Sequence, residues 1–307
     1  MNKQSILKRL SKDLKKYSGI YILFLPVLIY YLLFCYKPIY GLVIAFKDFR
    51  PGSGIWGSEW VGLQHFKDFF SSFYFFRILK NTLVISITSL VIGFPIPIIF
   101  ALLLNEIKNE KFKRITQTIT YMPHFISLVV LCSMINLFTS DKGIITAIVS
   151  FLGGPEHVSL LTESEFFVPI YVVSGIWQSM GWGSIIYLAA LSGVDQELYE
   201  AATIDGANRW KQTIHVTLPG ISGTIIIMFL LNIGKLMSVG HEKIMLLYNP
   251  GIYDTADVIS TFVYRKGLLN FEWSYSAAVG MFNSVINFIL IVSFNKISKK
   301  VTEIGLW

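Results

Sequence analysis

Long stretches without a charged residue constrain this chain more than any other feature of its sequence. Residues 20–36 contain no Asp, Glu, Lys or Arg, and neither do residues 81–104. A helix needs about 20 apolar residues to cross the hydrocarbon of a bilayer. One such run also occurs in buried helices of soluble proteins, but several in series favour a membrane protein. The composition agrees, because 15% of the residues are charged, whereas soluble domains have roughly a quarter.

The hydropathy pattern predicts an all-α polytopic membrane protein with six transmembrane helices. We expect the spans near residues 18–38, 79–105, 115–139, 166–192, 216–239 and 274–295. One membrane domain, 18–295, then lies between a basic N-terminal tail, 1–17, and a C-terminal tail, 296–307. The basic and then apolar start is similar to a secretion signal. No small-x-small cleavage site follows Tyr36, so we expect an uncleaved first span.

The positions of Lys and Arg predict the orientation, because these residues are retained on the cytoplasmic side of a membrane. The N-terminal tail, the turn after the second span and the C-terminal tail carry Lys3, Lys8, Arg9, Lys12, Lys15, Lys16, Lys108, Lys111, Lys113, Arg114, Lys296, Lys299 and Lys300. The loop between the third and fourth spans has only Lys142. We therefore expect a multi-pass protein of the bacterial cell membrane with both termini in the cytoplasm. Topology accounts for the net charge of +7, and no nucleic-acid partner is expected.

Residues that would carry enzyme chemistry are scattered along the chain. Cys35 and Cys132 lie in separate apolar spans, and the five histidines are not paired at motif spacing. We expect no metal site and no catalytic residue. The Gly234-Lys235 pair is followed by a leucine and lacks the earlier glycine of a phosphate-binding loop. Any ATP-driven process would therefore need a partner subunit.

The segment EAATIDGANRWKQTIHVTLPG, residues 200–220, is a polar exception between two apolar spans on the predicted cytoplasmic side. Asp205-Gly206 interrupts a run of good helix formers, since glycine adopts the backbone conformations that turns need. Pro219 suits the first turn of the span that follows. The sequence predicts a helix–turn–helix whose small residues allow a soluble partner to approach closely, with a helix inserted into a groove. The alternative is a solvated loop with chance helical content.

The residue pattern of this segment decides between these alternatives. It resembles the EAA loop of the membrane subunits of binding-protein-dependent ABC importers. In the loop 197–219, the matching residues are Glu200, Ala201, Ala202, Asp205, Gly206, Ala207, Leu218 and Pro219. The resemblance implies that these residues couple the chain to an ATPase. Thr213 stands where an aromatic residue is common, so details of docking stay open. Val216 stands where Ile is common, which is a conservative difference.

The likeness covers nearly the whole chain. Residues 15–49, 177–202 and 303–307 are similar to the LplB-type branch of the carbohydrate-uptake permeases, which is related to the MalF and UgpA subunits. The resemblance implies the type I ABC importer permease fold and import of a carbohydrate, an oligosaccharide or a polysaccharide fragment. It also implies a heterodimer with a second homologous permease, two copies of a cytoplasmic ATPase and an extracellular solute-binding protein. ATP and Mg would lie on the ATPase, with no cofactor on this chain.

Two other transport functions stay open from the residues alone. One is an ABC permease for a solute other than a sugar. The other is an ion-coupled secondary transporter, which would need carboxylates within the membrane. The predicted second to sixth spans have almost none in their apolar cores.

Polar residues of the fourth and fifth spans are candidates for the substrate path, because polar groups in hydrocarbon typically face a cavity or a neighbouring helix. The candidates are Trp177, Gln178, Asn232, Lys235, Ser238, His241 and Glu242. Aromatic faces bind the C–H surfaces of sugars, and amides or charges bind their hydroxyls. In the MalF-type relatives the end of the fifth span lines the substrate cavity, which favours 238–242. The alternatives are helix–helix hydrogen bonds for Gln178 and Asn232 and snorkelling for Lys235.

Overall fold

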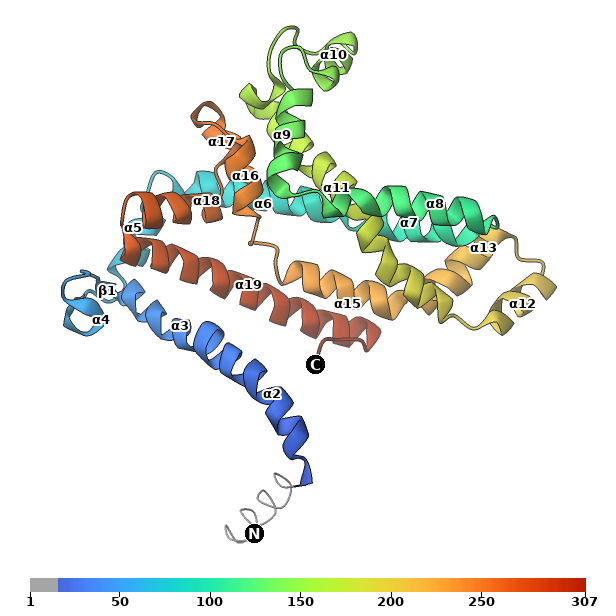
Figure 1. Ribbon diagram of the computed structural model, residues 1–307, viewed down its shortest axis with the longest axis horizontal. Helices are drawn as coiled ribbons and strands as arrows, with labels where there is room; N and C mark the ends of the chain where they lie inside the picture. The colour runs from blue at the N-terminus through green and yellow to red at the C-terminus, as the bar shows by residue number, and fades with distance from the viewer. Residues whose placement is uncertain (1–15) are drawn as a thin grey trace.

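The computed structural model describes residues 16–307, and these form helices joined by short turns (Figure 1). Five of the basic residues used to predict the orientation lie outside the described residues: Lys3, Lys8, Arg9, Lys12 and Lys15. The elements of the first half are α2 (Ser18–Tyr30), α3 (Lys37–Ile39), β1 (Lys47–Asp48), α4 (Gly54–Gly57), β2 (Glu59–Trp60), α5 (Gln64–Phe70), α6 (Phe75–Gly93), α7 (Pro95–Glu106), α8 (Glu110–Tyr121), α9 (Leu128–Phe138) and α10 (Ile144–Phe151). Those of the second half are α11 (Ser164–Ser192), α12 (Gln196–Ile204), α13 (Arg209–Gln212), α14 (Leu218–Gly220), α15 (Ser222–Ile233), α16 (His241–Leu247), α17 (Tyr253–Ala256), α18 (Ile259–Tyr264) and α19 (Trp273–Thr302). The short strands β1 and β2 pair antiparallel.

The long helices define a bundle with two distinct ends. Helices α6–α7, α8, α15 and α19 lie along the long axis, and α11 crosses them obliquely (Figure 1). Helices α12 and α13 lie at the right-hand end, whereas α4, α5 and β1 lie at the left-hand end. The polar loop and the segment between the first and second predicted spans, about 39–78, are therefore at opposite ends of the molecule.

Three of the predicted spans are helices long and apolar enough to cross a membrane. They are 29, 32 and 30 residues long and cover Ser18–Phe46, Phe75–Glu106 and Trp273–Thr302. The predicted fourth span corresponds to α11, a helix of 29 residues. It is not among the three helices apolar enough to cross a membrane by composition, because Gly, Ser, Gln and Trp residues interrupt its apolar sequence.

The predicted third span is not one helix. The segments Glu110–Phe125 and Leu128–Phe138 meet at an angle of 98°. A 3₁₀ turn that contains Pro123 precedes the break, and Ile126 and Ser127 are extended. Proline cannot continue the hydrogen-bond ladder of a helix, and Ser127 caps the new helix by accepting a hydrogen bond from the Val130 amide at 3.4 Å.

The predicted fifth span is shorter than expected. The segments Arg209–Gly220 and Ser222–Ile233 are bent by 62°. Helix α15 then ends at Ile233 instead of near residue 239, and 234–240 form turns rather than helix. Two glycines, Gly234 and Gly240, bound this irregular stretch.

Close helix crossings hold α11 in the bundle. A Cβ atom on Gly181 would overlap the backbone carbonyl of Thr120 on α8, and one on Gly183 would stand 3.3 Å from the Pro97 ring on α7. Small residues at helix crossings let backbones approach in membrane proteins. The close approach fixes α11 against α7 and α8, and these helices frame the site described below.

The first span stands apart from the bundle along residues 16–40 and contacts α19 only at its end, residues 40–46 (Figure 1). Every residue from 16 to 40 is exposed, including the large apolar side chains of α2. A helix that is apolar all round needs lipid or other apolar helices as its surroundings. The described residues of this chain do not supply that cover.

Candidate substrate cavity and coupling loop

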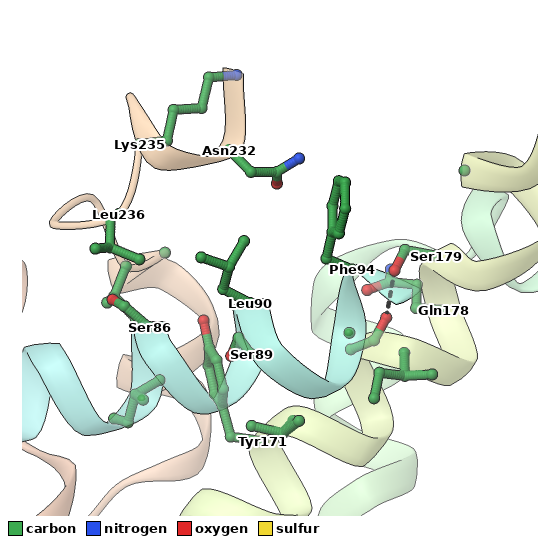
Figure 2. Close-up of a pocket in the computed structure, with 18 of the residues that line it drawn as sticks. Ser86, Ser89, Leu90, Phe94, Tyr171, Gln178, Ser179, Asn232, Lys235 and Leu236 are labelled. Carbon is green, nitrogen blue, oxygen red and sulfur yellow. Dashed lines mark hydrogen bonds between the residues drawn. The ribbon is translucent and has the colours of Figure 1, made fainter. Parts of the chain in front are cut away.

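A cavity of about 510 Å³ lies between α6, α7, α11 and the segment that joins α15 to α16. Its volume is typical of a ligand pocket. The polar residues of its lining are Ser86, Ser89, Tyr171, Gln178, Ser179, Tyr187, Asn232, Lys235, Ser238 and Lys243. Figure 2 shows Lys235 and Asn232 near the end of α15, across the space from Ser89 and Leu90 of α6, with Gln178 and Ser179 on α11. Two walls of the cavity thus carry groups that form hydrogen bonds.

Helical periodicity gathers the α11 lining on one face. Tyr171, Gly175, Gln178 and Ser179 are spaced by three and four residues, which places them one above the other on a helix. The Ser179 hydroxyl donates to the Gly175 carbonyl oxygen at 2.7 Å. The Gln178 amide donates only a long bond, 3.5 Å, to the carbonyl oxygen of Ile126 at the break before α9. Its amide is therefore weakly held and able to bind a ligand hydroxyl.

The opposite wall is irregular backbone that is held by α19. The Met237 amide donates to Asn287 Oδ1 at 2.9 Å, and Asn287 Nδ2 donates to the Ser238 hydroxyl at 2.9 Å. The Asn232 amide donates to the Met228 carbonyl oxygen at 2.8 Å. At membrane depth, non-helical backbone is tolerated where it lines a cavity or is buried in protein. The break after α15 is therefore consistent with a solute path.

Lys243 is a lining residue that sequence reasoning missed. The sequence placed it in an outer loop, where a solvated lysine is expected. In the structure its side chain is buried, with Nζ donating to the Tyr171 carbonyl oxygen at 2.9 Å and lying 4.6 Å from the centre of the Tyr171 ring. Two features of the sequence hinted that Lys243 belongs to the cavity: it follows Lys235 by eight residues, and apolar residues come after it.

The structure separates the other candidates for the substrate path. Gln178, Asn232, Lys235 and Ser238 line the cavity together. Trp177 lines a different, apolar cavity of about 790 Å³ between α9, α10 and α11. The His241 ring stacks on Tyr264 at 6.1 Å, and Glu242 is exposed. Neither His241 nor Glu242 is part of the lining.

The polar loop folds as two capped helices. Asp195 begins α12 by accepting a hydrogen bond from the Glu197 amide at 3.0 Å. The helix ends at Ile204. Gly206 follows in the turn with a φ of +75°, which favours glycine, and the Ala207 amide donates to the Ala202 carbonyl oxygen at 2.9 Å. Asn208 then caps α13 by accepting from the Lys211 amide at 2.9 Å. Side-chain caps and a left-handed glycine thus fix the turn that the sequence predicted.

Hydrogen bonds anchor this loop to the membrane helices. Arg209 Nη1 donates to Glu106 Oε2, at the end of α7, at 2.5 Å. The Tyr199 hydroxyl donates to the Thr217 hydroxyl at 3.0 Å, which joins α12 to the helix that leads into α15. Ile204 and Trp210 are exposed by 86% and 71%. The loop therefore has a fixed base and an exposed apolar tip.

The surface residues of the loop include most of the predicted coupling positions. Glu200, Ala201, Asp205 and Gly206 are exposed, as is Pro219, which lies in the short helix α14. Ala202, Ala207 and Leu218 are half-buried, and Leu218 packs against the apolar cluster that includes Ile98 and Leu191.

Comparison with known proteins assigns the chain to a family. The family "Binding-protein-dependent transport system inner membrane component" matches residues 93–303. The chain belongs to this family. It is therefore a permease subunit, a multi-pass component of the membrane, rather than an enzyme, and ATP hydrolysis occurs on a separate subunit.

Relatives of this permease are similar along almost its full length. Protein LplB of Bacillus subtilis (strain 168) is 45% identical over 96% of this chain and 92% of its own. The polygalacturonan/rhamnogalacturonan transport system permease protein YteP of the same organism is 44% identical over 98% of this chain and 94% of its own.

Solved structures confirm the all-α ABC importer permease fold. A bacterial ABC transporter involved in the import of the acidic polysaccharide alginate matches with a TM-score of 0.87 and 41% identity, over 96% of this chain and 99% of that one. The alginate transporter in complex with an alginate pentasaccharide-bound periplasmic protein matches with a TM-score of 0.88 and 40% identity, over 97% and 100%. The ion-coupled secondary transporter is therefore the wrong class for this permease.

Proposed function

We propose that this permease imports an oligosaccharide or polysaccharide fragment through the cavity between α6, α11 and the end of α15. The observation that carries the proposal is the lining itself. Gln178, Asn232 and Ser238 offer hydrogen bonds for hydroxyls, and Tyr171 offers an aromatic face. Relatives named for polygalacturonan, rhamnogalacturonan and alginate transport support a polysaccharide fragment as the substrate.

The loop 197–219 is proposed as the docking site for a cytoplasmic ATPase, two copies of which would hold ATP and Mg. Its exposed tip and fixed base support this role, since a coupling element must move the membrane helices when its own position changes. The Arg209–Glu106 contact joins it to α7, and α7 lines the cavity. If the ATPase docks at this end, both termini would lie in the cytoplasm, as the distribution of Lys and Arg predicts.

A second homologous permease is proposed to complete the structure. The exposed apolar side chains of the first span support a heterodimer. The extracellular solute-binding protein would approach the opposite end, near α4 and α5 (Figure 1). The structure of the alginate transporter in complex with a periplasmic protein supports a binding-protein partner.

Reconstitution tests the proposed function. The permease is assembled in liposomes with a second permease, an ATPase and a binding protein from the same organism, and uptake of labelled oligosaccharides is measured with and without internal ATP. We expect uptake that needs all four proteins and ATP. ATP-dependent uptake of amino acids or metal ions, with no uptake of oligosaccharides, would favour an ABC permease for a different solute.

A further inference from the structure

Lys243 is a buried cation whose carboxylate partner is missing from the described chain. Its exposed fraction is 8%, and its ammonium has a hydrogen bond to one backbone carbonyl, that of Tyr171. None of the ion pairs formed within residues 16–307 includes Lys243. An ammonium has three donors, and burying a charge without an ionic partner is unfavourable. Ionisable residues retained at such positions typically serve a transported solute.

The space around Lys243 is built to hold the ammonium. Ile244 and Leu247 of the same short helix are buried in the apolar cluster that includes Phe167 of α11, which fixes the position of α16. A Cβ atom on Gly175 would stand 3.4 Å from Lys243 Nζ. The glycine therefore leaves room for the charged group against the backbone of α11.

The part of the cavity lining that this chain supplies is positive. Lys235 and Lys243 both belong to its lining, and no Asp or Glu of the described chain does. Low-dielectric walls strengthen the field of like charges in a cleft and attract a ligand of opposite sign. The solute that satisfies both lysines is an anion.

The rest of the lining identifies the kind of anion. Ser86, Ser89, Gln178 and Asn232 are neutral groups suited to hydroxyls, and Tyr171 and Phe94 add aromatic rings. A small inorganic anion would leave these groups unused. A sugar chain that carries carboxylates uses the lysines, the hydroxyl-binding groups and the rings together.

We propose that this permease selects oligosaccharides with carboxylated sugar units, and that Lys243 is the residue that determines this preference. The inference rests on the proposed function and names the substrate class of the same cavity. In the absence of substrate the ammonium is held by the Tyr171 carbonyl oxygen. A sugar carboxylate would replace the missing ionic partner.

The test uses the complete transporter, trapped with ATP and a hydrolysis-deficient ATPase, so that retention by the permeases is measured apart from capture by the binding protein. The probes are labelled fragments of pectate and of alginate, each compared with its carboxyl-reduced neutral form. We expect the wild type to retain at least one acidic probe roughly tenfold better than its neutral form, the size of effect that a charged hydrogen bond gives.

Variants assign the preference to Lys243. Lys243→Gln should lower retention of the acidic probe roughly tenfold and leave the neutral form unchanged, and Lys243→Arg should restore most of the preference. Lys142→Gln, a matched change of an exposed lysine, should have no effect. Equal retention of acidic and neutral probes, or an unchanged preference in an assembled Lys243→Gln transporter, would overturn the inference and leave oligosaccharide import standing. Failure to retain any of these probes, while the reconstituted transporter still takes up another oligosaccharide, would also overturn the inference; loss of all oligosaccharide uptake would instead overturn the proposed function.

Discussion

Arg209 in the polar loop contacts Glu106 at the end of α7 through Nη1 and Oε2, 2.5 Å apart. The two residues are 103 positions apart in the sequence, and their contact joins the loop to a helix of the cavity wall. The pair is exposed, so it contributes only about 0–1 kcal/mol to the free energy of unfolding. Its importance would be in transmitting motion.

A charge swap tests this contact. Glu106→Arg should lower substrate-stimulated ATP hydrolysis by the assembled transporter, because two like charges then face each other at the base of the loop. The double variant Glu106→Arg with Arg209→Glu should recover most of the stimulation, as expected for residues that interact directly. If the double variant is as impaired as the single one, the contact does not transmit coupling.

The turn at Gly206 gives a second prediction. Gly206→Pro should abolish co-purification of the ATPase while the permease still inserts, since proline fixes φ near −65° and Gly206 has a φ of +75°. Gly54→Pro is a matched control, because Gly54 also has positive φ, 65°, and open space around it, but lies at the opposite end. ATPase recovery at wild-type levels with Gly206→Pro would rule out docking at this turn.

The crossing of α8 and α11 predicts a difference in stability between two glycines. Gly181→Ala should lower the melting temperature in detergent, because its Cβ would overlap the Thr120 carbonyl and overpacking costs about 1–3 kcal/mol. Gly280→Ala, in α19, meets no atom within 4 Å and should be neutral or slightly stabilising. Equal melting temperatures for the two variants would show that the crossing is looser than described.

The cavity lining predicts which polar residues affect transport. Asn232→Ala and Gln178→Ala should each weaken uptake by about fivefold, the equivalent of one hydrogen bond of about 1 kcal/mol. His241→Ala and Glu242→Ala should have smaller effects, because neither side chain lines the cavity. Initial rates of oligosaccharide uptake in liposomes rank the four variants. A larger loss for His241→Ala and Glu242→Ala than for the other two would show that the substrate path runs past α16 rather than through this cavity.

Much of this fold could be predicted from the sequence because membrane burial leaves a strong hydropathy signal. The positions of the long helices and the helix–turn–helix at Gly206 follow from composition, turn residues and caps. The 98° break before Leu128 could not be predicted, since the segments on both sides contribute to one continuous apolar pattern. The early end of α15 could not be predicted for the same reason, because a hydropathy pattern does not show where the backbone conformation changes.

The substrate path was only partly predictable. Gln178 and Asn232 lie in one cavity, but Trp177 faces another one, because successive residues on an α-helix point about 100° apart. Lys243 was missed because it is buried only when α16 packs back against α11. From the sequence alone, α16 falls in a loop after the fifth predicted span. Long-range packing, rather than residue type, makes this lysine a lining residue.

The most direct test of the account is to observe where the sugar lies. An electron cryomicroscopy structure of the complete transporter, trapped with ATP and an oligosaccharide that it imports, would show this. We predict sugar density between α6, α11 and the end of α15, in contact with Gln178, Asn232 and Lys243. Sugar density confined to the apolar cavity beside Trp177, with the Gln178–Lys243 cavity closed by side chains, would contradict the account.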